Sequence, residues 1–143
     1  MAKNKNKQNK ELIITEKPSV AKDIVEAIGG FKSVANGEYY ESDEYVCTYA
    51  VGHIIRLSEP EELDSKYKKW KLSDLPIIPQ EFKLFPIDSQ KKRLKVIEQL
   101  LKRADIVSVI NACDAAREGE LIFREIIKYF NCSKPIKRLW LQS

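Results

Sequence analysis

Residues 106–120, IVSVINACDAAREGE, carry the strongest indication of the fold. This stretch begins as a short apolar run that is typical of a buried strand, and it continues through a loop toward a helix that we place at residues 120–130. Residues 12–21, LIITEKPSVA, repeat the arrangement, with an apolar run, an acid and a helix opened by Pro18. Two strand–loop–helix units predict an α/β domain with a mainly parallel central sheet flanked by helices.

The remaining elements follow outward from these two units. Residues 58–87 hold four of the six prolines, a density typical of an irregular segment. Strand-forming residues surround the polar turn at 41–44, which predicts an inserted hairpin. The expected elements are a helix at 18–28, a hairpin within 37–57, a loop excursion at 58–87, a helix at 88–103 with its apolar stripe at Leu94, Ile97, Leu100 and Leu101, and a closing strand at 136–141.

Composition excludes several classes of protein. The 143 residues, of which 43% are hydrophobic and 32% charged, fit one globular domain. The sequence has no apolar run of 18 residues, so we expect no membrane span. Its three cysteines are odd in number and widely spaced, which predicts reduced, buried thiols in a cytoplasmic protein rather than a disulfide framework or a zinc site. A single histidine excludes a multi-histidine metal centre.

The positive charge belongs to one end of the chain. The net charge is +4, and the first ten residues hold four lysines and no acid. We therefore expect residues 1–10 to form a disordered basic tail and residues 11–143 to form the domain. The overall charge says little about the folded surface, so local patches must carry any argument for a polyanionic partner.

Three acids follow the two predicted buried strands. Glu16 follows the first strand, and Asp114 and Glu118 follow the second. The carboxyl ends of neighbouring parallel strands meet at one edge of a sheet, so we expect these carboxylates to converge there. Asp114 and Glu118 are four residues apart and would share one helix face if the helix began at Asp114. Mg²⁺ prefers such carboxylates together with phosphate oxygens. Lys17 and Arg117, beside these acids, either offset their charge or contact a substrate phosphate.

Four stretches resemble a known family, the TOPRIM domain of type IA DNA topoisomerases. The bacterial topoisomerase III branch is the most similar. Because these motifs are separate and occur in the family's order, together they are specific. The resemblance covers roughly residues 11–143 and implies a Rossmann-like TOPRIM fold. The matching stretches are LIITEKPSVA at 12–21, YAVGHIIRL at 49–57, DAAREGELIFR at 114–124 and KRLWLQS at 137–143.

The resemblance implies roles at the reacting phosphate. Glu16 matches the family's TOPRIM glutamate, a general acid/base in strand cleavage and rejoining. Lys17 would assist beside the scissile phosphate, and Arg117 would contact DNA phosphate. His53 lies in a matching Gly-His pair, which makes it either a phosphate-contacting group or a satisfied structural histidine.

The resemblance also implies a magnesium site. Asp114 and Glu118 match the first and third acids of the family's D-x-D-x-E motif, which hold Mg²⁺ near Glu16. Ala116 stands where the family pattern has its middle acid, so we expect weaker Mg²⁺ binding. Without the resemblance, Glu16 reads as a helix-start acid, and Asp114 and Glu118 as a capping pair. Glu120 reads as a capping or supporting group rather than a ligand.

The implied activity is cleavage and rejoining of single-stranded DNA. Type IA enzymes use a tyrosine nucleophile from a later domain, and none of the six tyrosines here matches its motif. We therefore expect an N-terminal fragment of a longer cytoplasmic, nucleoid-associated enzyme. It would be inactive alone, with single-stranded DNA and the remaining topoisomerase domains as partners. The alternatives are a standalone TOPRIM nuclease or primase-like enzyme and a non-catalytic nucleic-acid-binding module.

Two basic segments have two interpretations each. The helix at 91–103 presents either a solvated lysine face or a patch that tracks phosphates. Residues 66–71 either form an exposed loop anchored by Trp70, or offer Trp70 as a stacking surface for a base.

Overall fold

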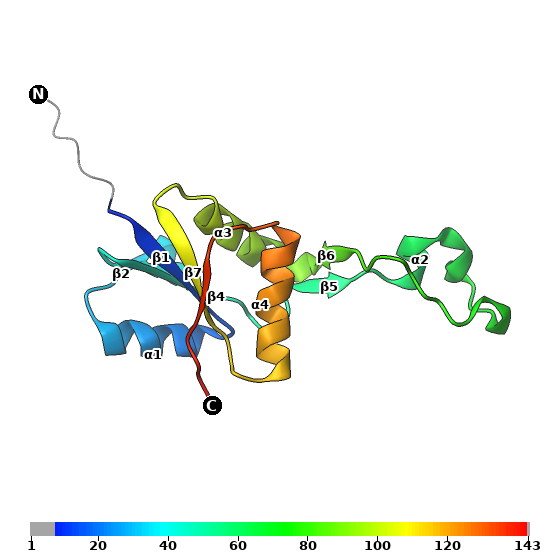
Figure 1. Ribbon diagram of the computed structural model, residues 1–143, viewed down its shortest axis with the longest axis horizontal. Coiled ribbons are helices and arrows are strands. Elements are labelled where there is room, and N and C mark those ends of the chain that lie inside the picture. The colour runs from blue at the N-terminus through cyan, green and yellow to red at the C-terminus, as the bar shows by residue number, and fades with distance from the viewer. Residues whose placement is uncertain (1–7, 143) are drawn as a thin grey trace, which may run out of the picture.

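The computed structural model describes residues 8–142 and confirms the α/β fold. In this part of the chain a sheet has the strand order β2-β3-β4-β1-β7-β8, with helices on both faces (Figure 1). Strands β4, β1, β7 and β8 are parallel, whereas β3 pairs antiparallel with β4 and with β2. The elements of this body are β1 Lys10–Thr15, α1 Pro18–Ile28, β2 Lys32–Val34, β3 Tyr39–Glu41, β4 Tyr45–Tyr49, α3 Lys91–Leu101, β7 Ile106–Ala112, α4 Arg117–Tyr129 and β8 Ile136–Arg138.

Strand β1 lies between β4 and β7, and its two faces are buried beneath helices on either side of the sheet. Leu12 and Ile14 pack into the larger apolar cluster, together with residues of α3 and α4. Ile13 points the other way, into a smaller cluster with Ala21 of α1. Alternate side chains of a strand face opposite sides of the sheet, so a continuous apolar run suits this central position.

The apolar stripe of α3 is as expected, but one basic residue of this helix is buried rather than exposed. Leu94, Ile97, Leu100 and Leu101 are buried, as predicted. Arg93, which lies in the basic segment 91–103, is also buried and so belongs to neither a solvated face nor a phosphate patch: it pairs with Glu38 and lies over the ring of Tyr49. No side chain caps the start of α3, which follows a 3₁₀ turn at Asp88–Gln90.

Other expectations differ in detail. The predicted tail lies outside the described residues as far as residue 7, and Lys10 already begins β1. Helix α4 begins at Arg117, three residues earlier than expected. Cys47 and Cys113 are buried free thiols as predicted, whereas Cys132 is half-buried. In the part of the chain described, no helix is long and apolar enough to cross a membrane.

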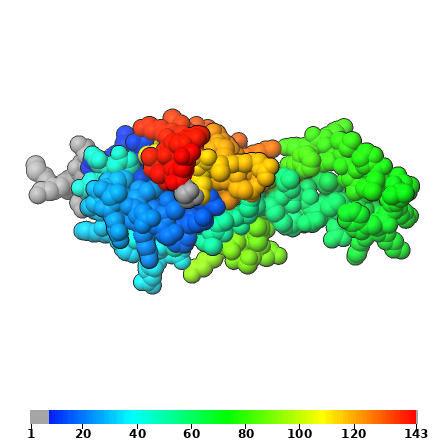
Figure 2. Space-filling view, turned by 90° about the horizontal axis from the view of Figure 1, so that it is seen from below, coloured from blue at the N-terminus to red at the C-terminus, as the bar shows by residue number. Residues whose placement is uncertain are grey.

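The excursion leaves the body as a two-stranded ribbon. Strand β5, Ile55–Leu57, pairs antiparallel with β6, Leu84–Pro86. The segment between them contains the short helix α2, Pro60–Leu63, and two 3₁₀ turns, and it projects from the body (green in Figures 1 and 2). Residues 59–83 include no buried residue, and Trp70 is 79% exposed. Trp70 therefore does not anchor this segment, which corrects that interpretation.

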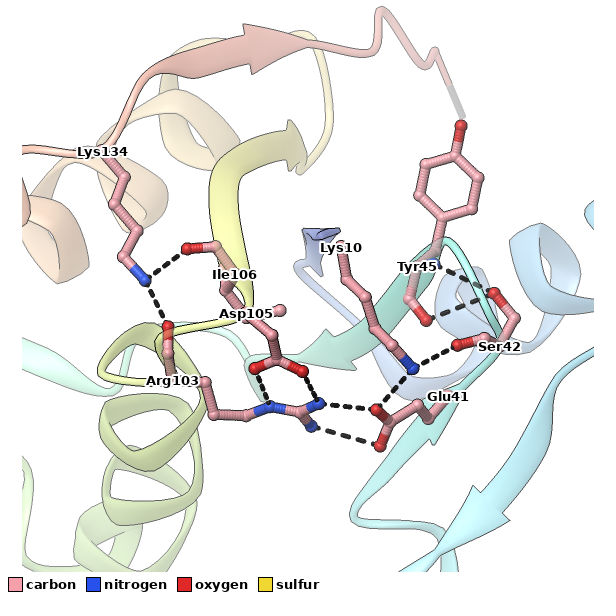
Figure 3. Close-up of polar contacts among 8 residues, drawn as sticks. All are labelled: Lys10, Glu41, Ser42, Tyr45, Arg103, Asp105, Ile106 and Lys134. Carbon is pink, nitrogen blue, oxygen red and sulfur yellow. Dashed lines mark hydrogen bonds and ion pairs between the residues drawn. The ribbon is translucent and has the colours of Figure 1, made fainter. Parts of the chain in front are cut away.

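A polar network fixes the amino-terminal end of the sheet (Figure 3). The Arg103 guanidinium lies 2.6 Å from Glu41 Oε1 and 2.7 Å from Asp105 Oδ2. Lys10 Nζ lies 2.8 Å from Glu41 Oε1, and Lys134 Nζ donates to the carbonyls of Arg103 and Ile106. The network joins β1, β3 and β7 at the end opposite to Glu16 and Asp114, so its role is structural.

Candidate functional site

The carboxyl ends of β1 and β7 lie side by side. Thr15 is in register with Ala112, so Glu16 and Cys113 are the next residues on neighbouring strands. Burial raises the pKa of the Cys113 thiol to about 12, and the negative charges of Glu16, Asp114 and Glu120 contribute to this shift. Glu16 and Asp114 therefore follow neighbouring parallel strands at one edge of the sheet, as expected from the topology.

Asp114 lies in a turn before α4 rather than on the helix. It forms a parallel bridge with Leu141, and the amide of Ala115 donates to the Leu141 carbonyl at 2.7 Å. Because α4 begins at Arg117, Glu118 lies in its first turn while Asp114 precedes it. The expectation that Asp114 and Glu118 share one helix face is therefore wrong.

Two residues without an assigned role hold the Asp114 turn. The Arg138 guanidinium, from the end of β8, donates to the carbonyls of Asn111, Cys113 and Asp114 at 3.0, 2.7 and 3.1 Å. On the other side Gly119 packs so closely that a Cβ atom there would lie 2.3 Å from the Asp114 carbonyl oxygen. Sequence reasoning missed both, although each lies inside a quoted family motif.

Glu118 pairs with the single histidine. Its Oε2 lies 3.0 Å from His53 Nε2, while His53 Nδ1 lies 3.4 Å from Glu125 Oε2. The hydrogen bond to His53 is the main reason that the pKa of Glu118 is lowered, and the same bond is the main reason that the pKa of His53 is raised. The structure thus places His53 in contact with a predicted metal ligand.

Glu120 has neighbours that explain its role. Its carboxylate accepts from Asn111 Nδ2 at 2.9 Å and pairs with Arg124 at 2.7 Å. The pairing with Arg124 is the main reason that the pKa of Glu120 is lowered. Asn111 also accepts from the amide of Cys113, so Glu120 supports the strand end that carries Asp114.

Lys17 and Arg117 lie at the exposed rim. Lys17 is exposed at the residue that precedes α1, and its carbonyl accepts from the Thr15 hydroxyl at 2.9 Å. Arg117 is 93% exposed, and its Nε lies 3.6 Å from Glu118 Oε1. Both cations are accessible to an anion that approaches the acids from solvent.

The donor chemistry of this edge suits a hard cation. Among residues 8–142 no three His, Cys, Asp or Glu side chains converge as a complete metal site. The high pKa of Cys113 keeps its thiol protonated at neutral pH, so only carboxylates remain as donors near it. Mg²⁺ commonly uses one or two carboxylates and completes its shell with water and substrate phosphate. Glu16 and Asp114 fit that requirement.

The comparisons with known proteins identify the domain. A family model described as the Toprim domain matches residues 11–143. The chain belongs to the Toprim domain family. This Toprim chain is 45% identical over 135 residues to the DNA topoisomerase 3 of Bacillus cereus (strain ATCC 10987 / NRS 248), a match that covers 94% of this chain and 18% of that protein.

Two further relatives give the same result. The DNA topoisomerase 3 of Staphylococcus haemolyticus (strain JCSC1435) is 46% identical over 134 residues, which cover 94% of this chain and 19% of the relative. The protein of that name from Bacillus anthracis is 46% identical over 134 residues, which cover 94% and 18%. The Toprim chain thus spans about a fifth of the length of these curated relatives, and the resemblance found in the motifs is confirmed.

Proposed function

We propose that this Toprim domain is the Mg²⁺-binding half of the active site of a type IA DNA topoisomerase of the topoisomerase III kind, acting on single-stranded DNA. The observation that carries the proposal is the placement of Glu16 and Asp114 at adjacent strand ends, in a chain whose relatives are named DNA topoisomerase 3. Clustered carboxylates beside exposed cations suit a metal-assisted phosphoryl-transfer site.

Different residues of the site would bind the metal, transfer the proton and contact the phosphate. Asp114 and Glu118, with Glu16, would hold Mg²⁺, which offsets the negative charge of the reacting phosphate. Glu16 transfers a proton to or from the oxygens that leave and attack. Lys17 and Arg117 contact the phosphate oxygens from the exposed rim. His53 positions the Glu118 carboxylate, and it acts on the phosphate site only through that contact.

The nucleophile would come from outside this Toprim domain. A type IA enzyme supplies its tyrosine from a later domain, so the remaining topoisomerase domains and single-stranded DNA are the partners. The Toprim domain by itself neither cleaves nor relaxes DNA. The complete enzyme works in the cytoplasm, associated with the nucleoid.

A chimera tests the proposal. Residues 9–143 replace the corresponding stretch of the Bacillus cereus DNA topoisomerase 3, and relaxation of negatively supercoiled plasmid is measured with Mg²⁺ and with chelator. The proposal expects Mg²⁺-dependent relaxation that Glu16→Gln abolishes while Glu26→Gln, an exposed change on α1, leaves it intact.

The chimera has clear contrary outcomes. Relaxation that survives Glu16→Gln would contradict the assigned role of this acid. Metal-dependent DNA cleavage by the 143-residue chain alone would favour a standalone nuclease instead.

A further inference from the structure

A cavity of about 600 Å³ opens beside the acidic edge, between the start of α4 and the closing strand β8. In Figure 2 the C-terminal segment (red) lies beside the first turns of α4 (yellow to orange). Ala115 and Ala116, which directly follow Asp114, form part of its lining. The cavity is therefore continuous with the turn that carries Asp114, the first predicted magnesium ligand. The proposed function gives the cavity itself no role.

The charge of the lining is positive. Arg117, Arg124, Lys137 and Arg138 line the cavity, against the single carboxylate of Glu120. Arg124 and Arg138 both pair with that carboxylate, at 2.7 and 3.4 Å. Lys137 also pairs with Glu11 at 2.7 Å, and Arg117 lies 3.6 Å from Glu118. Four cations thus face three carboxylates, and the remaining positive charge favours an anionic ligand.

Trp140 gives the cavity an aromatic wall. Its side chain is 69% exposed, and the Arg138 guanidinium lies 5.6 Å from its ring centroid. Exposed indole rings beside basic groups are the usual stacking surface for bases of single-stranded nucleic acid.

The second exposed tryptophan lies in different surroundings. Trp70, in the excursion, borders a hollow of about 150 Å³ that is lined by the carboxylates of Glu59 and Glu61 and one ammonium, Lys68. The hollow beside Trp70 thus lacks the excess of positive charge found in the lining beside Trp140, although Trp70 itself belongs to the basic segment 66–71. The observations thus favour Trp140 over Trp70 as the base-stacking residue.

We propose that this cavity is a nucleotide subsite for single-stranded nucleic acid, in which Trp140 stacks on a base while Arg117 and Arg124 contact the adjoining backbone. The inference rests on the proposed function, because it places the bound nucleotide next to the phosphate at the acidic edge. It adds a base-contacting residue to a site otherwise built from charged groups.

The two tryptophans allow a direct test, because the chain contains no others. Unlabelled oligo(dT) of about ten nucleotides is titrated into the Trp70→Phe and Trp140→Phe variants of the 143-residue chain, and indole fluorescence is followed. The subsite predicts strong quenching in Trp70→Phe, where only Trp140 reports. It predicts little change in Trp140→Phe, where only Trp70 reports.

Affinity gives the second readout. By fluorescence anisotropy of a labelled oligonucleotide, Trp140→Ala is expected to weaken binding about tenfold, and Trp70→Ala less than twofold. Equal quenching in both single-tryptophan variants, or Trp140→Ala binding within twofold of the parent, would overturn the subsite. Either result leaves the proposed function standing if the chimera still relaxes plasmid, whereas an inactive chimera removes that function itself.

Discussion

Asp114 depends on two residues that do no chemistry themselves. Arg138 donates to the carbonyls of Asn111, Cys113 and Asp114 from one side, and Gly119 allows α4 to approach the Asp114 backbone from the other. We propose Asp114 as a Mg²⁺ ligand, and such a carboxylate needs this support because a displaced ligand loses affinity even when its chemistry is unchanged.

Gly119→Ala should therefore disturb the site while improving the local helix propensity. The added Cβ would lie 2.3 Å from the Asp114 carbonyl, so the turn must move. We expect a loss of about 2 kcal/mol in the free energy of unfolding, measured by urea denaturation. We also expect weaker Mg²⁺ binding. Lys128→Ala, an exposed change on the same helix, should change stability by less than about 0.5 kcal/mol. A Gly119→Ala protein as stable as the parent would refute the close packing.

Ala116→Asp restores the acid that the family motif has at this position. Ala116 is exposed and precedes α4 in extended conformation, where an Asp side chain also caps the helix. We expect tighter Mg²⁺ binding by isothermal titration calorimetry and an unfolding free energy higher by about 1 kcal/mol without metal. Unchanged or weaker affinity in a stabilised variant would show that residue 116 does not face the metal.

At the scale of elements, the amino-terminal end of the sheet is fixed by charge. Glu41 ends β3 and accepts hydrogen bonds from Arg103 and Lys10. Arg103 is the main reason that the pKa of Glu41 is lowered. This one carboxylate joins β3 to β1 and to the turn that leads into β7, so its charge contributes to the stability of the sheet.

Glu41→Gln tests that contribution through pH. Because folding lowers the pKa of Glu41, its stabilisation is present above the ordinary carboxyl pKa and is lost as pH falls through the lowered value. At pH 7 the variant should be less stable by about 2 kcal/mol, and the difference should shrink below about pH 4.5. Urea denaturation across this range measures it, with exposed Glu26→Gln as the control. A difference independent of pH would contradict the ionic explanation.

The excursion is expected to contribute little to the stability of the body. Replacing residues 59–82 by Asn-Gly would close β5 and β6 into a tight hairpin, since Ser58 already donates to the Lys83 carbonyl at 2.8 Å. The segment buries no residue, so we expect the unfolding free energy to change by less than about 1 kcal/mol. Thermal denaturation by circular dichroism measures it. Loss of cooperative unfolding would show that the excursion supports the core.

Elements with a strong local pattern were predictable, and those set by distant pairing were not. The apolar runs of β1 and β7 and the stripe of α3 were identified because burial imposes a period on the sequence. Strand β2, Lys32–Val34, is short and polar, and it pairs only as an edge. Strands β5 and β6 are separated by the excursion and form only after the chain returns.

For the whole molecule, the adjacency of Glu16 and Asp114 was predictable from topology, whereas the expected convergence with Glu118 is not seen: among residues 8–142 no three such side chains form a metal-binding group, and Glu118 pairs with His53. Glu16 and Asp114 were expected together because neighbouring parallel strands end at one edge. The clamp by Arg138, the pairing of His53 with Glu118 and the cavity at Trp140 were not predicted. The first two are contacts between residues more than twenty positions apart, and the cavity is a surface formed by two elements. Neither composition nor spacing in the sequence indicates such contacts.

The most direct test of the account is a magnesium titration of the ¹⁵N-labelled 143-residue chain, followed by two-dimensional NMR. A Mg²⁺-binding half-site predicts saturable shifts of the backbone amides around Glu16 and from Asp114 to Glu118. It also predicts their loss in Asp114→Asn. Shifts confined to other acidic surfaces such as the excursion, or shifts that persist in Asp114→Asn, would contradict the claim that this edge of the sheet holds the metal.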